Sequence, residues 1–210
     1  MASTLPAYKT AFLESCLSAN VLTFGTFTLK SGRHSPYFFN AGSFHTSALL
    51  SSISTAYAHT IISFLAANPS IPKPDVIFGY NRKEAKDHGE GGNIVGSSLK
   101  GKNVLVIDDV ITAGTAMRET LSLVSKEGGK VVGFAVALDR LEKMPGPKEK
   151  EGIDDGEPRM SAMGQIRREY GVPTASIVTL DDLIMLMKDK GDEDDLKKLE
   201  AYRKRYQASD

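Results

Sequence analysis

The sequence contains one cysteine and no excess of charge of either sign, and these absences limit what the chain can be. Cys16 alone cannot form an internal disulfide or a multi-cysteine zinc site, which fits a reducing compartment such as the cytosol. Lys plus Arg and Asp plus Glu both number 26, so no global positive field argues for a nucleic-acid partner. Any anion must therefore be bound by a local cluster of cations.

Long, purely apolar runs are also missing. The first residues, Met-Ala-Ser-Thr-Leu-Pro, lack the basic-then-apolar order of a signal peptide. Between His45 and Lys73 many Ser and Thr interrupt the apolar residues, so we expect a core helix rather than a membrane span. With 210 residues, 41% of them hydrophobic, no repeat and no second domain, we expect a single cytoplasmic domain over residues 1–210.

The most informative stretch runs from Val104 to Thr115. Its four apolar residues Val104 to Ile107 predict a strand buried on both faces, and Asp108 and Asp109 follow where that strand would leave the sheet. Small and hydroxylated residues come next, and then a helical pattern with one apolar face. The residues of that face are Met117, Leu121 and Val124.

This order of strand, tight turn and helix suits a phosphate, because it aims backbone N–H groups and a helix N-terminus at the turn. Two carboxylates would repel a bare phosphate, but they suit the hydroxyls of a ribose phosphate. The alternative is a buried strand that ends in an Asp-rich turn, with Thr112 or Thr115 as an N-cap. The stretch resembles the phosphoribosyl-diphosphate (PRPP) signature of type I phosphoribosyltransferases.

Two further segments resemble the orotate phosphoribosyltransferases in particular. Residues 29–40 (LKSGRHSPYFFN) are similar to the substrate-binding segment of that family. Residues 82–92 (RKEAKDHGEGG) are similar to its catalytic loop, which reaches over the active site of the partner subunit. Taken alone, residues 82–92 would read as a solvated charged loop, and Phe38 and Phe39 as ordinary strand residues with one side in the core.

The resemblance implies an α/β fold of the type I phosphoribosyltransferase kind: a central, mostly parallel sheet flanked by helices, with a small N-terminal hood. We expect residues 1–45 to contribute the hood and residues 82–92 to form a mobile loop. The Lys, Glu, Gly and Pro content of residues 141–158 predicts a second, exposed loop with little fixed structure. The expected strands cover residues 21–29, 75–79, 131–138 and 175–180, and the expected helices cover 6–19, 46–67, 163–170, 182–190 and the stripe from Leu196 to Tyr206.

The resemblance also assigns site residues, with PRPP and orotate as ligands. The expected PRPP-binding residues are Lys30, Arg82, Lys83, Lys86, His88, Asp108, Asp109, Val110, Ile111, Thr112, Ala113, Gly114, Thr115 and Ala116. The expected catalytic residues among them are Lys86, His88, Asp108 and Asp109. The expected orotate-binding residues are Phe38, Phe39, Thr112 and Arg140, with Arg140 on the orotate carboxylate. Magnesium is implied as a cofactor that is held mainly through PRPP, with no direct protein ligand set.

One part of the family pattern is missing after Gly79. In the family, the strand that matches Asp75 to Gly79 runs into a Tyr-Lys turn that grips diphosphate, and a helix and a further strand precede the charged loop. Here Gly79 is joined almost directly to Tyr80-Asn81-Arg82. Because neighbouring parallel strands need a crossover of a dozen residues or more, we expect one strand to be lost and the sheet to narrow, or the loop to start from the wrong place.

The leading hypothesis is an orotate phosphoribosyltransferase that makes orotidine 5′-monophosphate and diphosphate in pyrimidine biosynthesis, acting as a homodimer. A second hypothesis is a non-catalytic relative that binds ribose phosphate, or an inactive splice or gene-model variant. A third keeps the fold but takes a purine or uracil, against which the segment at Phe38 and Phe39 argues. A fourth is that the chain does not fold stably, because losing a helix uncovers apolar sheet surface.

Overall fold

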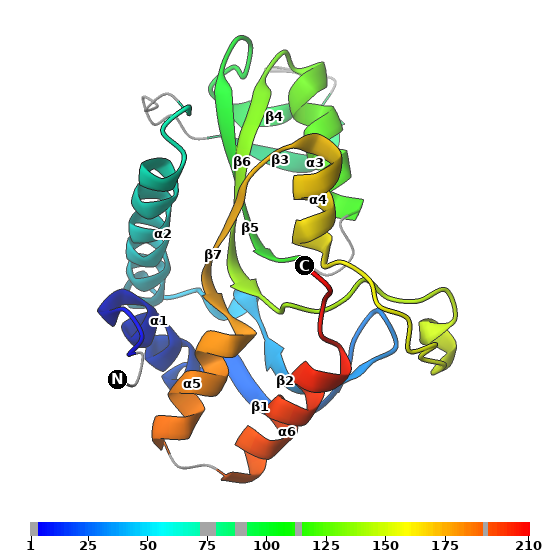
Figure 1. Cartoon of the computed structure of the whole chain (residues 1–210). Coiled ribbons are helices and arrows are strands. Elements are labelled where there is room, and N and C mark those ends of the chain that lie inside the picture. Colours follow the sequence, from blue (N-terminus) through cyan, green and yellow to red (C-terminus); the bar gives the residue numbers. More distant parts are fainter. Residues whose placement is uncertain (1–3, 72–78, 87–91, 112–114, 191–192) are drawn as a thin grey trace.

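The structure is a computed structural model that describes residues 4–71, 79–86, 92–111, 115–190 and 193–210. Its centre is a parallel sheet of β5 (Asn103–Val110), β6 (Lys130–Asp139) and β7 (Thr174–Thr179), with β6 in the middle. Helix α2 covers one face of this sheet, and α3 and α4 lie on the other (Figure 1). The expected α/β architecture is therefore confirmed.

The helices follow the apolar patterns of the sequence closely. Their bounds are α1 Ala7–Ser18, α2 Ser47–Ala67, α3 Thr115–Lys126, α4 Ala162–Tyr170, α5 Leu180–Lys190 and α6 Glu193–Arg205. The Thr46 hydroxyl caps α2 by accepting from the Leu49 N–H, and Gly171 ends α4 in the left-handed conformation at φ 62°. On α3, Met117 and Val124 are buried as their spacing predicts.

The N-terminal hood is an antiparallel hairpin of β1 (Leu22–Thr28) and β2 (His34–Phe39). A short 3₁₀ turn, Ala41–Ser43, leads from it to α2. Figure 1 shows the hairpin beside α6, below the parallel sheet. Its apolar residues join those of α1, α5, α6 and the ends of β6 and β7 in one core, which includes Leu22, Tyr37 and Leu138. The hood is thus part of the main hydrophobic core rather than a separate unit.

Helix α2 is the one described helix that is long and apolar enough to cross a membrane, by length and composition alone. Its buried residues Ala56, Thr60 and Phe64 recur every four residues and so lie on one side of the helix, whereas Leu50 and Ile62 are exposed. The Phe64 ring lies so close to Gly133 of β6 that a side chain at residue 133 would collide with it. This contact places α2 directly on the sheet.

Residues 79–96 differ from the expectation. Strand β3 (Gly79–Lys86) pairs with β4 (Gly92–Gly96) as an antiparallel hairpin in a sheet of its own, so residues 82–86 are strand rather than loop. The rest of the expected loop, residues 87–91, lies outside the described residues. The expected strand 75–79 also lies outside them except for Gly79, which begins β3. The described part of this segment therefore pairs as antiparallel strands, whereas a further parallel strand would need a crossover of a dozen residues or more.

The prediction that residues 104–107 are buried on both faces was wrong. None of them is fully buried, and the Ile107 side chain is 51% exposed. Within the described ranges β5 pairs only with β6, so it is an edge strand among the strands that the structure describes. The strand also continues through Asp108 and Asp109 to Val110. Among the described residues the parallel sheet has three strands, and the expected strand 75–79 lies outside them except for Gly79, so the predicted narrowing of the sheet stays a prediction.

The prediction of an exposed, weakly structured loop at residues 141–158 holds only in part, because most of the segment is exposed but parts of it have fixed contacts. Lys143 and Glu149 are buried, and a short 3₁₀ turn spans Glu149–Glu151. Isolated β-bridges join Glu142 to Gln207 and Lys143 to Ser161. Charged residues give this segment its fixed structure because their partners lie elsewhere in the fold, where composition alone cannot reveal them.

Candidate functional site

The site begins with Asp108 and Asp109 at the carboxyl end of β5. Asp108 Oδ1 accepts from the Asp109 N–H at 2.9 Å, and Asp109 Oδ1 accepts from the Val110 N–H at 2.6 Å. Each carboxylate therefore keeps one oxygen outside these local bonds. Among the described residues neither carboxylate forms an ion pair, which leaves both available to hydroxyls of a ligand.

Helix α2 supports this strand end from behind. The Tyr57 hydroxyl donates to the backbone carbonyl of Asp108 at 2.7 Å. Burial raises the pKa of Asp108; the Asp109 N–H opposes this shift and the negative charge of Asp109 adds to it. Burial and the two neighbouring carboxylates likewise raise the pKa of Tyr57, so its hydroxyl stays protonated as a donor. Holding Asp108 ionised at neutral pH thus costs free energy in the folded chain.

The strand and helix that frame the expected phosphate turn are both present. Strand β5 ends at Val110 and α3 begins at Thr115, whereas Thr112, Ala113 and Gly114 lie outside the described residues. The Ile111 side chain is buried with Met117 in a second core cluster, so a ligand could use only its backbone. Ala116 is exposed on the first turn of α3.

The charged residues expected on diphosphate are described only in part. Arg82, Lys83 and Lys86 belong to β3, but their side chains lie outside the description, as does the whole of His88. Lys30 is exposed in the turn between β1 and β2. Their convergence on a ligand therefore stays a prediction.

The two aromatic residues expected to contact orotate point to opposite sides of β2. Phe39 is 8% exposed and belongs to the main core, whereas Phe38 is 41% exposed and stacks on Phe27 with ring centroids 5.4 Å apart. A strand alternates its side chains between two faces, so only one of two neighbours can face a ligand. The Phe39 side chain is thus a core residue, and Phe38 is the one available for stacking.

Arg140 lies at the end of β6 and is only 4% exposed. Its Nε donates to Glu142 Oε1 at 2.6 Å, and its Nη2 donates to Ser35 Oγ at 2.8 Å and to the Tyr202 hydroxyl at 3.3 Å. The guanidinium also lies over the Tyr37 ring, 4.2 Å from its centroid. Burial lowers the pKa of Arg140, but Tyr37 and Glu142 more than reverse this and keep it charged. Arg140 is therefore rigidly held rather than openly displayed to solvent.

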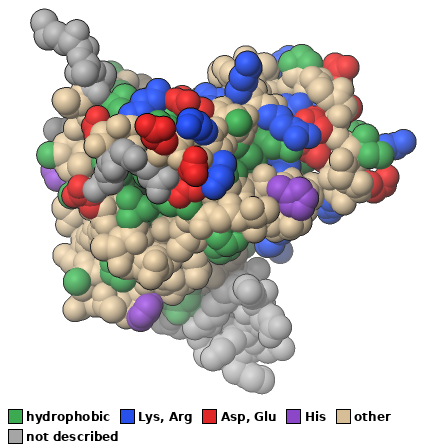
Figure 2. Space-filling view, turned by 90° about the horizontal axis from the view of Figure 1, so that it is seen from below, with side chains coloured by type: hydrophobic (Ala, Val, Ile, Leu, Met, Phe, Trp, Pro, Cys, Tyr) green, Lys and Arg blue, Asp and Glu red, His purple; other side chains and the backbone are tan. Residues whose placement is uncertain are grey.

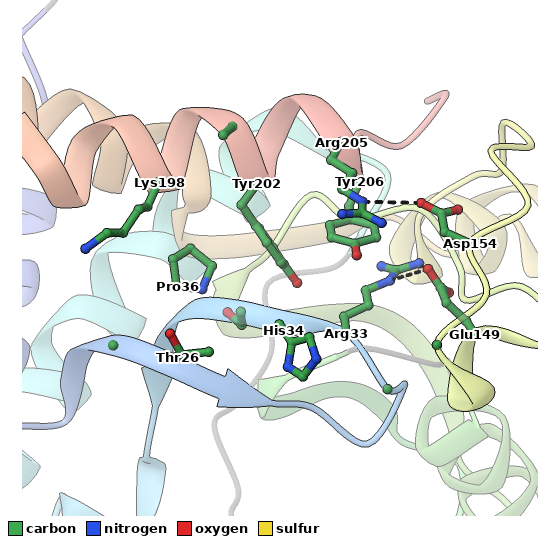
Figure 3. A pocket seen from close by; sticks show the side chains of 15 residues that line it. Thr26, Arg33, His34, Pro36, Glu149, Asp154, Lys198, Tyr202, Arg205 and Tyr206 are labelled. Atoms are coloured by element: carbon green, nitrogen blue, oxygen red, sulfur yellow. Dashed lines mark hydrogen bonds and ion pairs between the residues drawn. The ribbon is translucent and has the colours of Figure 1, made fainter.

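A separate cavity of about 440 Å³ lies between the hood hairpin and α6 (Figure 3). Arg33 points to Glu149 on one wall and Arg205 points to Asp154; Tyr202 projects from α6, and Tyr206 directly follows this helix. Residues 32–36 of the expected substrate-binding segment line it, but none of the residues assigned individually to PRPP or orotate does so within the described part of the chain. Its charged walls are already paired, so the Asp108–Asp109 edge remains the candidate site.

Sequence reasoning missed four residues that shape the site from behind. Tyr57 holds the backbone at Asp108, while Glu142, Ser35 and Tyr202 hold Arg140. Tyr57 and Tyr202 lie on helical apolar stripes, which predict core residues but not a hydroxyl partner on a distant strand. On the face seen in Figure 2, acidic and basic side chains lie next to one another, so no large area of one sign marks a different binding surface.

Comparison with known proteins identifies relatives of this chain. The model of the phosphoribosyl transferase domain matches residues 57–155. Orotate phosphoribosyltransferase of Metarhizium anisopliae is 48% identical over 238 aligned positions that cover 100% of both chains, and that of Neurospora crassa is 47% identical, covering 99% of this chain and 100% of its own. The crystal structure of orotate phosphoribosyltransferase from Francisella tularensis superposes with a TM-score of 0.72 at 32% identity, covering 94% of this chain and 99% of that one.

The length of the first alignment also bears on the missing crossover. It spans 238 positions, 28 more than the 210 residues of this chain, so the Metarhizium protein carries residues that have no counterpart here. That difference is close to the length of a strand–helix–strand unit. The alignment nevertheless covers the full length of both chains at this identity, so the chain belongs to the orotate phosphoribosyltransferase family.

Proposed function

We propose that the chain transfers the 5-phosphoribosyl group of PRPP to orotate, giving orotidine 5′-monophosphate and diphosphate in pyrimidine biosynthesis. The single observation that carries this proposal is the pair Asp108 and Asp109, set at the end of a parallel strand with no cation of the described chain beside them. Relatives with 47–48% identity over nearly the full chain carry the name of this activity.

In the proposed reaction, displacement of diphosphate from C1 builds positive charge on the ribose ring and negative charge on the leaving group. Asp108 and Asp109 would accept hydrogen bonds from the ribose hydroxyls, and the turn from Thr112 to Thr115 would bind the 5-phosphate. Their carboxylates would also stabilise the positive charge on the ring electrostatically, since it develops close to them. Catalysis then consists mainly of positioning and charge stabilisation.

The leaving group would be met by the cations on and after β3. We assign this role to Lys30, Arg82, Lys83, Lys86 and His88, with Lys86 and His88 nearest the reacting atoms. Charge-assisted hydrogen bonds to phosphate oxygens are among the strongest that side chains make. The chain would act as a homodimer in the cytoplasm, with residues 82–92 reaching the site of the partner subunit.

Orotate would lie between the hood and the end of β6. Phe38 is exposed and would stack on the ring, and Arg140 would bind the carboxylate. Thr112 would contribute a hydroxyl or a backbone group. The Phe39 side chain is committed to the core, so its contribution to this site is limited to its backbone.

Magnesium fits the residues present, although no group of three or more His, Cys, Asp and Glu gathers as a metal site in the described part of the chain. Magnesium usually binds through one or two carboxylates and phosphate oxygens while keeping several waters. Asp108 and Asp109 each retain a carboxylate oxygen outside their local bonds. When bound, mainly through PRPP, the ion would neutralise part of the charge on the diphosphate leaving group.

A direct test follows orotate consumption by ultraviolet absorbance, with purified protein, PRPP and magnesium. The matched variant carries Asp108→Asn and Asp109→Asn together. Turnover that the double substitution abolishes is the expected result, and it would show that the missing crossover is tolerated. Folded protein without turnover would overturn the proposal.

A second candidate, a non-catalytic ribose-phosphate-binding relative, is favoured by the 28 alignment positions that this chain lacks. The family's Tyr-Lys turn for diphosphate has no counterpart after Gly79. This candidate predicts that PRPP raises the melting temperature while orotate is not consumed. Parallel thermal-shift and absorbance measurements separate the two.

A further inference from the structure

A cluster of four charged residues, of which Arg33, Arg140 and Glu149 are buried and Glu142 is partly buried, joins the hood to the segment that follows β6. Arg33 binds Glu149 through two hydrogen bonds, Nε to Oε1 and Nη2 to Oε2, both at 2.9 Å. Its Nη1 donates to Glu142 Oε2 at 3.1 Å, and Glu142 Oε1 accepts from Arg140 Nε at 2.6 Å. The order of contacts is therefore Glu149, Arg33, Glu142, Arg140. Two arginines and two carboxylates balance in charge, which is what a buried ionic cluster requires.

Glu142 is the one carboxylate of this cluster that both arginines share. Its Oε1 also accepts from the Tyr202 hydroxyl at 2.9 Å, so it is fixed from three elements: the hood, the end of β6 and α6. Glu149, by contrast, binds Arg33 and the Gly146 N–H but makes no bond to Arg140. Glu142 is therefore in contact with Arg140, whereas Glu149 contacts Arg33 and lies farther from Arg140.

Hydrogen bonds within the described chain occupy two of the three guanidinium nitrogens of Arg140. Nε is bound by Glu142, and Nη2 is bound by Ser35 and Tyr202. For Nη1 the described residues provide no hydrogen-bond acceptor. Since a guanidinium is planar, fixing Nε and Nη2 also fixes the direction of Nη1.

We propose that Glu142 is a positioning residue that locks Arg140 so that Nη1 is presented to the orotate carboxylate. Glu142 itself does not touch the substrate. The part of this inference that concerns orotate rests on the proposed function, whereas the locking of Arg140 does not. A side chain held in its bound geometry loses less conformational entropy when the ligand arrives, so the lock acts on orotate affinity.

Glu142→Gln and Glu149→Gln form a matched pair that separates positioning from mere structure. Both substitutions remove one buried negative charge with little change of shape, and both are expected to lower the melting temperature. Only Glu142→Gln is expected to raise the KM for orotate, by about tenfold or more, with the KM for PRPP unchanged. Equal KM values for orotate in the two variants would overturn the proposal.

An activity-independent measurement uses hydrogen exchange of the arginine Nε–H groups by NMR. Arg140 Nε–H is bound by Glu142 and Arg33 Nε–H by Glu149, so each variant should speed exchange at one arginine and spare the other. In Glu142→Gln the Arg140 signal should exchange at least tenfold faster. Unchanged exchange there would overturn the lock even if the wild-type chain turns over no orotate.

Tyr202→Phe provides a second route should Glu142→Gln fail to fold. It removes the hydroxyl that contacts both Glu142 and Arg140 but keeps the ring that packs edge-on against Tyr37. The expected result is a smaller rise in the KM for orotate, about two- to fivefold, again without a change in the KM for PRPP. A rise in both KM values would indicate a general distortion and contradict the positioning role.

Discussion

Two pairs of carboxylates in this molecule have opposite surroundings. Asp108 and Asp109 lie near the end of β5, an edge strand among those described, and the described residues offer them no cation. Glu142 and Glu149 lie in a buried cluster in which Arg33 contacts both. The first pair keeps carboxylate oxygens free for a ligand, whereas the carboxylates of the second pair bind arginines of the fold.

These different surroundings distinguish a carboxylate that binds a ligand from one that stabilises the fold. Burial without a cationic partner raises the pKa of Asp108, which is a destabilising arrangement that a structural role does not explain. Glu149 is buried more deeply, yet a bidentate arginine satisfies it. Charged residues that destabilise the fold because they lack an oppositely charged partner in it are therefore the better candidates for function.

The largest expected effect comes from breaking the structural pair. Arg33→Met keeps the aliphatic stem but leaves Glu149 buried without a cation, which should cost about 3–5 kcal/mol of unfolding free energy. Urea denaturation followed by circular dichroism measures this change. In the double variant with Glu149→Gln, much of the loss should be recovered. A loss below about 1 kcal/mol in the single variant would show that the pair contributes little.

The next effect concerns the binding pair. Asp108→Asn should lower turnover by about 100-fold or more, because it removes a charge that faces the reacting ribose. The same change should raise the unfolding free energy at neutral pH, since the buried, ionised carboxylate is destabilising. Activity assays and urea denaturation of the same preparation measure both. Loss of activity together with loss of stability would contradict a binding role.

The pH dependence of this stability difference has a definite sign. The pKa of Asp108 in the folded chain lies above 3.8, so folding favours the protonated carboxyl. The stability that this protonated carboxyl contributes is complete below pH 3.8 and is lost as the pH rises through the folded-state pKa. The advantage of Asp108→Asn should therefore shrink on acidification. Asp155→Asn is the opposite control: its ion pair with Arg159 lowers the pKa of Asp155 to about 2, so its stabilising effect is present at neutral pH and lost towards that value. Parallel pH profiles of the two variants that run in the same direction would contradict this account.

A smaller effect is expected from the support behind Asp108. Tyr57→Phe removes the hydroxyl that donates to the Asp108 carbonyl and should cost about 1 kcal/mol of unfolding free energy. Tyr170→Phe, at an exposed position, is the control and should change it by less than about 0.5 kcal/mol. Equal stability of the two variants in urea would mean that the Tyr57 hydroxyl bond contributes nothing net.

The smallest expected effect on stability comes from Ile107→Lys on the open edge of β5. An exposed apolar edge strand promotes association between copies, and a lysine there should reduce light scattering on heating while changing the unfolding free energy by less than about 0.5 kcal/mol. Ile62→Lys on the exposed side of α2 is the control for hydrophobicity alone. If both variants reduce scattering equally, the strand edge has no special part in association.

Much of the fold could be predicted from local patterns in the sequence. The Thr46 cap, the Met117 and Val124 face and the apolar run of β6 each depend on residues close together in the chain, and each is confirmed. The failures share the opposite property. Residues 141–158 look like a solvated loop because the partner of Glu149 is Arg33, 116 residues away.

The site was predictable to a similar degree. The strand, the two carboxylates and the start of α3 follow from one continuous stretch, and the structure has them in that order. The exposure of Ile107 could not be predicted from the residues next to it in the sequence. A run of β-branched residues predicts a buried strand, and whether it is buried depends on what packs against it elsewhere in the fold. The division between Phe38 and Phe39 needed the strand register, which the aromatic pair alone does not supply.

Calorimetric titration of PRPP with magnesium into the wild-type chain and into the Asp108→Asn, Asp109→Asn variant tests most directly whether the carboxylates near the end of β5 hold a ribose phosphate. The account predicts saturable binding to the wild type and at least tenfold weaker binding to the variant, with both chains folded by circular dichroism. Equal binding to the two chains, or no binding to folded wild type, would contradict it.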